Sequence, residues 1–381
     1  MSKKKKRKIR TGLRKKYDEP ARESDWTRKF QQSQLSEDQN ASQRVSGKGR
    51  LTRHRTVSGE EVEDETGGFQ ILLDVDLNEC IPARVLRVHG LATIVSDDSG
   101  RIFECAVRGL LKTLATDLQH VVVAGDFVQI KPLNEHQAVI VRVEPRRSAV
   151  SRTSRGRQQI LFSNVDQVLV VCSAAEPRLK PNLVDRFLIS CEKSKITPLI
   201  IINKVDLVDL ADLQPVIGVW GQLGYQVLCT STVTGFGIHR MIELVCGKDS
   251  VVVGQSGVGK SSMLNAIEPG LSLRVGDVSE ESQKGKHTTT TANFIPLSIG
   301  GHVVDTPGIR QFQLWDVIAQ EVEGYFRDIR PFINHCKFPD CRHLHEADCA
   351  VKYAVADGKI DERRYESYCQ IFQENIRPAG G

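Results

Sequence analysis

The chain has 381 residues, 40% of them hydrophobic and 26% charged, which is ordinary for a globular protein and enough for two or three domains. No apolar run approaches the roughly 18 residues of a membrane span, and the N-terminus lacks an apolar signal-peptide core, so we expect a cytoplasmic protein without membrane partners. Residues 1–55 hold 18 Lys and Arg against 6 Asp and Glu, whereas the rest of the chain holds 34 against 41. This asymmetry favours a polyanionic partner, although such a segment can also serve only as a solubilising tail.

Residues 1–65 are polar and basic, and they are predicted to be a disordered tail because they offer little apolar surface to bury. Residues 66–150 change to short alternating apolar runs, at 71–73, 83–88, 92–95, 102–107, 127–130 and 138–143. This pattern predicts a small barrel of OB type that binds RNA, with another small β-domain as the alternative. Basic residues near its end suit contact with phosphate or form an ordinary solvated linker; they are Arg142, Arg146, Arg147, Arg152, Arg155 and Arg157.

Residues 151–312 alternate apolar strands with helical stretches. Strands are expected at 168–171, 199–202, 226–229, 251–253 and 302–304, with helices between them such as 183–193 and 238–246. Continuous apolar strands separated by helices are typical of a parallel sheet that is covered on both faces. The fold class is therefore multidomain, with a β-barrel followed by an α/β domain.

A glycine-rich stretch within this α/β region has the G-x4-G-K-S spacing of a phosphate-binding P-loop, between an apolar strand and a helix start. Its glycines let successive backbone N–H groups point at phosphate oxygens, and Lys260 can stabilise charge on the transferring phosphoryl group. The residues expected to hold the nucleotide are Gly254, Gln255, Ser256, Gly257, Val258, Gly259, Lys260, Ser261 and Ser262.

Two further segments favour guanine as the base. Asn203, Lys204, Val205 and Asp206 form N-K-V-D directly after the predicted strand at 199–202, and the Asp carboxylate can accept from the two neighbouring donors of guanine. Behind the next strand, Ser231 and Thr232 lie in a loop able to close on the base. The sequence therefore predicts a GTP or GDP site.

A third segment, Asp305 to Gly308, closes another apolar strand as D-T-P-G and suits contact with the γ-phosphate and its metal. Hydroxyls of Ser261 and of Thr289, in the polar loop before it, are expected to ligate Mg²⁺. N-K-V-D precedes the P-loop here, whereas regular GTPases have the reverse order. The domain is therefore interpreted as circularly permuted, which is possible because domain termini often lie close together.

Residues 313–381 are predicted to form a zinc-binding helical domain. Cys336, Cys341, His343 and Cys349 form C-x4-C-x-H-x5-C, a donor set that suits one tetrahedral structural zinc ion. His345 is a possible competitor for the fourth position. The six cysteines before this region are interpreted as reduced, mostly buried residues.

With these motifs in place, the sequence resembles the RsgA (YjeQ) family of circularly permuted GTPases. The match rests on the P-loop, on G-K-H-T-T-T at 285–290, on D-T-P-G, on N-K-V-D and on the cysteine spacing. The resemblance implies a GTP hydrolase of late small ribosomal subunit maturation, which binds rRNA through its barrel and zinc modules. It implies that the subunit stimulates hydrolysis, that hydrolysis releases the protein, and that the protein acts as a monomer.

The residue that orients the attacking water is not the one found in Ras-like enzymes. Ile309 occupies the position after D-T-P-G where Ras-like enzymes have a glutamine, so intrinsic hydrolysis is expected to be slow. The resemblance suggests His287 for this role, with a packing or capping role in its loop as the alternative. Two other functions stay open: a non-catalytic GTP-dependent RNA-binding scaffold, and a signalling GTPase with a protein effector.

Overall fold

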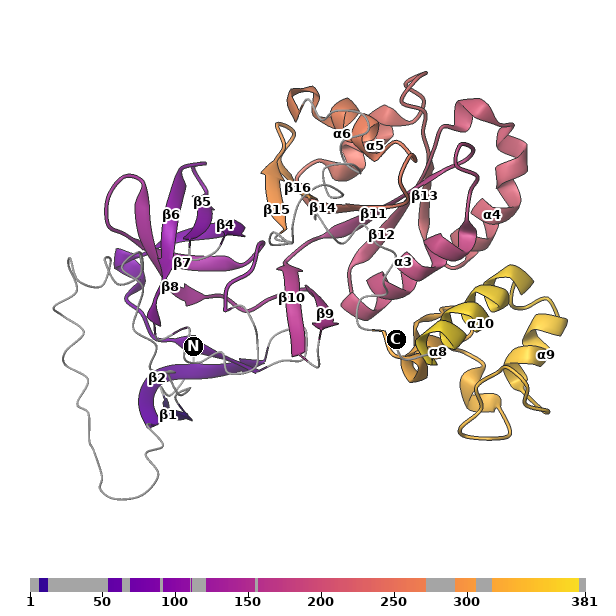
Figure 1. The fold of residues 1–381 in the computed structure, drawn as a ribbon, viewed down its shortest axis with the longest axis horizontal. Helices are drawn as coiled ribbons and strands as arrows, with labels where there is room; N and C mark the ends of the chain where they lie inside the picture. The colour runs from indigo at the N-terminus through magenta and orange to yellow at the C-terminus, as the bar shows by residue number, and fades with distance from the viewer. Residues whose placement is uncertain are drawn as a thin grey trace, which may run out of the picture. The chain divides into compact units, whose positions relative to one another are not determined.

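The computed structural model describes residues 7–12, 54–63, 69–89, 92–109, 111, 121–154, 157–271, 292–305 and 317–376. The chain divides into two compact units at Asn164 and Val165, and Thr291–Phe294 belongs with the first unit (Figure 1). No helix of the described residues is long and apolar enough to cross a membrane.

The first unit contains the predicted barrel. It closes in the order β4-β5-β6-β8-β7, and β6 and β8 are its one parallel pair among the described strands. The strands are β4 (Ile81–His89), β5 (Ala92–Asp97), β6 (Ile102–Val107), β7 (Phe127–Pro132) and β8 (Gln137–Val143). Alternate residues point inward, among them Val85, Val95, Ile130 and Ile140, and each of these is fully buried. The period-2 alternation in the sequence therefore produced the expected barrel with a packed interior.

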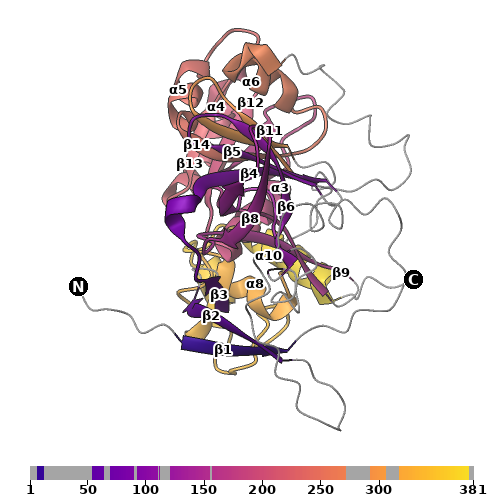
Figure 2. The same cartoon turned by 90° about the vertical axis from the view of Figure 1, so that its left-hand side faces the viewer.

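Regular structure also occurs in the segment that the sequence predicts to be a disordered tail. Strands β1 (Arg7–Gly12) and β2 (His54–Glu63) pair antiparallel, and β2 pairs with β3 (Phe69–Leu73) to complete a three-stranded sheet (Figure 2). The prediction of disorder is wrong for these two strands, because pairing of β1 with β2 and of β2 with β3 supplies backbone hydrogen bonds that composition does not reveal. The run at 71–73 accordingly belongs to this sheet and not to the barrel.

A buried ion pair joins the barrel to the hairpin of β9 (Ala149–Ser154) and β10 (Arg157–Ser163). The Asp126 carboxylate accepts from Arg146 Nε at 2.7 Å and Nη2 at 2.8 Å, and from Ser163 Oγ at 2.6 Å. Asp126 is fully buried and Arg146 is 6% exposed. Asp126 therefore links Arg146 to the hairpin through Ser163, and the burial of Arg146 in this pair corrects the reading of this arginine as a contact for phosphate. Arg142 is likewise engaged, with Glu144 at 2.6 Å.

The second unit is built on a six-stranded sheet of order β13-β12-β11-β14-β16-β15. Every described pairing from β13 across to β16 is parallel, as the apolar strands predicted. The strands are β11 (Gln167–Ser173), β12 (Thr197–Asn203), β13 (Gln226–Cys229), β14 (Lys248–Val253), β15 (Asn293–Pro296) and β16 (Gly301–Asp305). Helices α5 (Ile238–Val245) and α6 (Lys260–Ile267) lie on one face, and α3 (Pro181–Ser194) and α4 (Leu210–Gln222) on the other (Figure 1).

The same unit ends in residues 317–376, which we call the C-terminal module. Its elements are η5 (Ala319–Glu321), α8 (Val322–Tyr325), η6 (Ile333–His335), α9 (Ala350–Ala356) and α10 (Glu362–Ile376). Phe326, Val351 and Tyr368 lie in its core, and Ile189 of α3 packs into the same cluster. The module is therefore packed against α3.

Candidate nucleotide site and metal centre

The nucleotide-binding motifs follow the carboxyl ends of parallel strands in one sheet. The P-loop follows β14, N-K-V-D begins at the last residue of β12, and Ser231 comes shortly after β13. Because the carboxyl ends of parallel strands meet at one edge, the three motifs lie at the same edge. Although N-K-V-D precedes the P-loop in the chain, the sheet brings the two motifs to one edge, as in GTPases with the regular motif order.

The P-loop glycines hold a backbone that no other residue could adopt easily. Gly254, Gly257 and Gly259 have φ angles of +147°, +81° and +94°. A Cβ atom at Gly254 would lie 2.1 Å from the carbonyl oxygen of Val171, and one at Gly259 would lie 2.4 Å from Asn203 Nδ2. Positive φ favours glycine at all three positions, and the close approach of the Val171 backbone at Gly254 and of the Asn203 amide at Gly259 leaves no room for a Cβ atom.

Lys260 and Ser261 occupy the start of α6. The Lys260 ammonium donates to the carbonyls of Gly254 at 2.9 Å and Gln255 at 2.7 Å, so it lies over the phosphate-binding loop. Ser261 is 6% exposed, and Ser256 and Gly257 at the tip of the loop are exposed. These positions fit a loop that wraps an anion at a helix N-terminus.

Asn203 joins the P-loop to the loop after β13, which the sequence predicts to close on the base. Its Nδ2 donates to the Val258 carbonyl at 3.0 Å, and its Oδ1 accepts from Thr230 Oγ1 at 3.2 Å. Asn203 and Thr230 are both fully buried. The side chain of Asn203 therefore orients two loops, whereas Thr230, its partner, was not among the predicted site residues.

The rest of N-K-V-D leaves the strand in a tight turn. Lys204 has φ of +61°, and its ammonium donates to the carbonyl of Glu176. Val205 is buried and its N–H donates to the Thr230 carbonyl at 3.2 Å. The carboxylate of Asp206 is exposed at this edge, where a base could reach it.

The loop after β13 is closed by its own hydrogen bonds. Ser231 is fully buried, and its Oγ accepts from the N–H groups of Val233 at 3.3 Å and Thr234 at 3.1 Å. Gly237 ends the loop at φ of +71°, where a Cβ would lie 2.2 Å from the Cys229 carbonyl oxygen. Thr232 is half-buried beside Ser231. The loop is thus preformed next to Asn203.

Some predicted site residues lie outside the described residues. These are His287, Thr289 and Gly308, together with Ile309. Asp305 is the last residue of β16, which neighbours the P-loop strand β14 in the sheet.

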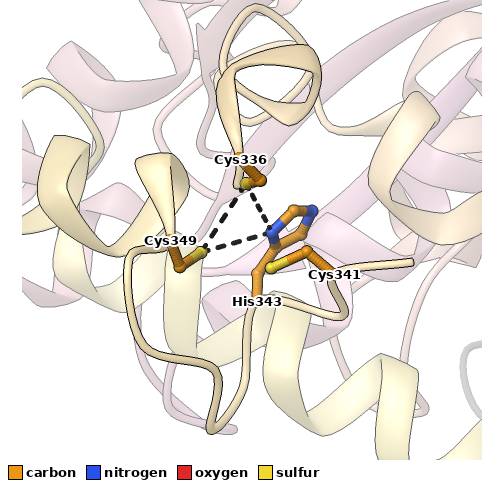
Figure 3. A group of neighbouring side chains, drawn as sticks. All are labelled: Cys336, Cys341, His343 and Cys349. Atoms are coloured by element: carbon orange, nitrogen blue, oxygen red, sulfur yellow. Dashed lines mark hydrogen bonds between the residues drawn. The ribbon is translucent and has the colours of Figure 1, made fainter. Parts of the chain in front are cut away.

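The four predicted zinc ligands converge in the C-terminal module, with their donor atoms all within 4.8 Å of one another (Figure 3). His343 Nδ1 lies 3.4 Å from both Cys336 Sγ and Cys349 Sγ, and these two sulfurs are 3.9 Å apart. A tetrahedral zinc ion with Zn–S of about 2.3 Å and Zn–N of about 2.0 Å separates its ligands by about 3.5–3.8 Å. The Cys₃His set therefore fits zinc in both chemistry and spacing.

The protein surroundings affect ionisation of the three thiols differently. Burial raises the pKa of Cys341 to about 12 and also raises the pKa of Cys349. Burial opposes ionisation of Cys336 as well, but backbone N–H groups of Val351 and Ala350 outweigh it and hold its pKa below the ordinary value. Three neighbouring thiolates would repel one another, and a divalent ion removes that cost.

Residues outside the motif hold the ligands in place. His343 Nε2 lies 3.0 Å from Glu323 Oε2, which leaves Nδ1 to face the cysteines. The hydroxyl of Tyr365 donates to the His343 carbonyl at 2.6 Å, and that of Tyr368 to the Arg342 carbonyl at 2.9 Å. Glu323 was not predicted, because nothing in its local sequence distinguishes it from a surface glutamate. His345 is exposed and is not among the four clustered residues.

Comparison with known proteins agrees with this geometry. Residues 143–315 match the RsgA GTPase family. The small ribosomal subunit biogenesis GTPase RsgA of Hahella chejuensis is 41% identical over 324 residues, which is 84% of this chain and 90% of that protein. Its counterpart from Thermotoga petrophila is 38% identical over 288 residues, which is 74% of this chain and 92% of that protein.

Two solved structures are similar as well. The crystal structure of YjeQ from Thermotoga maritima matches with a TM-score of 0.66 and 34% identity, over 78% of this chain and 99% of that one. YloQ, described as a circularly permuted GTPase, matches with a TM-score of 0.62 and 28% identity, over 81% of this chain and 99% of that one. The permuted order of motifs, the barrel before them and the Cys₃His cluster after them are thus accompanied by likeness over most of the chain. The chain belongs to the RsgA GTPase family.

Proposed function

We propose that this protein is a GTP hydrolase that acts in the late maturation of the small ribosomal subunit. The observation that carries the proposal is the joint placement of the P-loop and N-K-V-D at one sheet edge, tied together by Asn203. The relatives' names, small ribosomal subunit biogenesis GTPases, supply the partner. The same partner argues for action in the cytoplasm, and we propose that the protein acts as a monomer.

The residues around the phosphates are proposed to have separate roles in hydrolysis. Lys260 stabilises charge that develops on the transferring phosphoryl group. Ser261 would hold Mg²⁺ together with Thr289, and its hydroxyl makes no hydrogen bond to another described residue, so it is available for a ligand. The metal neutralises phosphate charge when bound. His287 is proposed to orient the attacking water, as the resemblance to the RsgA family suggests, since Ile309 has no polar group that could do so.

RNA contact is proposed for the barrel and the C-terminal module. OB barrels commonly bind oligonucleotides across one face, and the barrel here closes with that topology. In this proposal, both modules bind rRNA of the small subunit while GTP is bound, and hydrolysis, stimulated by the subunit, releases the protein.

The test is the rate of GTP hydrolysis by the purified protein alone, with small subunits and with large subunits. Strong stimulation by small subunits only, lost in Lys260→Ala, is the expected result. The leading alternative is a non-catalytic GTP-dependent RNA-binding scaffold. GTP binding without hydrolysis under all three conditions would support the scaffold and overturn the proposal. Hydrolysis without any binding to rRNA in the GTP state would favour a signalling GTPase.

A further inference from the structure

Helix α3 has a stripe of mostly polar residues that packs against the C-terminal module instead of facing solvent. Six residues at helical spacing contact the C-terminal module, and we call them the docking face: Asn182, Asp185, Arg186, Ile189, Glu192 and Lys193. At about 100° per residue these positions fall within one third of the helix circumference. In a sequence, such a stripe of charges is ordinarily read as a surface.

Asp185 lies at the centre of the docking face and is fully buried. Its Oδ1 accepts from Trp220 Nε1 of α4 at 3.1 Å and lies 2.7 Å from Arg364 Nη1 of α10. Its Oδ2 accepts from Arg363 Nη1 at 3.3 Å. The Asp185 carboxylate on α3 therefore contacts both α4 and helix α10 of the C-terminal module.

Arg364 is also buried, and it is held by a second carboxylate that belongs to the C-terminal module. It is 1% exposed, it donates from Nε and Nη2 to the two oxygens of Asp328 at 3.0 Å each, and its guanidinium lies 4.6 Å from the Phe326 ring centroid. A buried guanidinium between two carboxylates is stable only while both partners are present. Separation of the module from α3 would leave Asp185 without both of its arginine partners and Arg364 without one of its two carboxylates.

The remaining residues of the docking face continue the contact along the whole helix. Asn182 bonds Ser367 and Gln370, Arg186 pairs with Glu374, Glu192 pairs with Arg327 at 2.6 Å, and Lys193 pairs with Glu321 at 2.6 Å. Ile189, 1% exposed, belongs to the module's own apolar core. Charges of opposite sign thus meet along the helix around one apolar contact.

The opposite face of α3 lies beside the P-loop. Leu183, Val184 and Phe187, about half a turn away from the docking face, line a cavity together with Gln255 and Val258. Val258 is the residue whose carbonyl accepts from Asn203. A single rigid helix therefore has the zinc-binding module on one side and the phosphate-binding loop on the other.

We infer that α3 couples the zinc site to the nucleotide site, with Asp185 as the positioning residue. The zinc-filled module holds α3 in register against the P-loop, so zinc occupancy strengthens binding of guanine nucleotide. By thermodynamic reciprocity, bound nucleotide strengthens binding of zinc by the same factor. The inference rests on the proposed function only in taking guanine nucleotide as the ligand of the P-loop.

The first experiment uses the full-length wild-type protein. Zinc affinity is measured by competition with a chromogenic chelator, with and without saturating GDP, and the affinity for a fluorescent GDP is measured on zinc-loaded and zinc-depleted protein. We expect both affinities to change by the same factor, about fivefold or more. Equal zinc affinity with and without GDP, or equal GDP affinity with and without zinc, would overturn the coupling. Failure of zinc-loaded protein to bind GDP would instead overturn the nucleotide site itself.

Variants then locate the coupling in α3. Asp185→Asn should retain zinc yet lose most of the mutual effect, while Glu192→Gln, at the far end of the docking face, should weaken it. The matched control is Glu243→Gln on α5, whose carboxylate pairs with Arg240 on an exposed surface away from the module. It should leave the coupling at the wild-type value. A wild-type coupling in both docking-face variants would refute the role of α3, and if Asp185→Asn does not fold, Glu192→Gln decides.

Discussion

Replacement of Asn203 by alanine tests the central feature of the nucleotide site. The substitution removes a donor to the Val258 carbonyl at 3.0 Å and an acceptor for Thr230 Oγ1 at 3.2 Å, both in a fully buried setting. A buried polar group that loses its partner costs about 1–3 kcal/mol. Two such groups would together cost about 2–6 kcal/mol. Because the space left by the amide can admit a water molecule, we expect the free energy of unfolding to fall by about 2–3 kcal/mol, near the lower end of that range.

Asn203→Ala should also weaken nucleotide binding, beyond its effect on the free energy of unfolding. Asn203 fixes the distance between the P-loop and the base-binding loop, and each 1.4 kcal/mol of lost binding energy is tenfold in affinity. We expect Asn203→Ala to weaken GDP binding at least tenfold under conditions in which the protein is still folded. Urea unfolding and titration with fluorescent GDP measure the two effects separately.

Thr230→Val provides the comparison, because it removes only one of the two hydrogen bonds. It should cost about 1 kcal/mol of unfolding free energy. In the double variant the effects should be less than additive, since the Asn203–Thr230 bond can be lost only once. If Asn203→Ala binds GDP with wild-type affinity, the two loops are positioned by other contacts and the reasoning is refuted.

Three other substitutions test the base site, the metal centre and the barrel. Asp206→Asn should shift preference from guanine to xanthine nucleotides in a competition assay; unchanged selectivity for GTP would contradict the assignment of the base site. Glu323→Gln should lower zinc affinity about 10- to 100-fold in chelator competition, because His343 loses the carboxylate that orients it; Glu366→Gln, at an exposed position of α10, is the control. Asp126→Asn should lower the free energy of unfolding by about 3–5 kcal/mol, because it leaves Arg146 buried without its counter-charge; a loss below about 1 kcal/mol would show that the buried pair contributes little.

Local motifs determined much of this protein from the sequence alone. The P-loop, N-K-V-D, D-T-P-G and the cysteine spacing each fit within a short stretch, and each requires particular residues because backbone geometry or metal coordination allows few others. Their order along the chain was enough to indicate circular permutation, since strands can join a parallel sheet in any order that brings their ends together. Alternation of apolar residues likewise predicted the barrel.

Only the tertiary structure decided which charged and polar side chains are partners. In the sequence, Arg146 looks like a surface cation, and only the structure shows that it pairs with the buried Asp126. Arg363 and its partner Asp185 are 178 positions apart, so the sequence gives no sign of their contact. Strands β1 and β2 were missed for the same reason, because they form by pairing with each other and, for β2, with β3, which their own composition does not reveal. Hydrogen bonds and ion pairs are short-range and depend on geometry, so they become visible only when the fold has brought distant residues together.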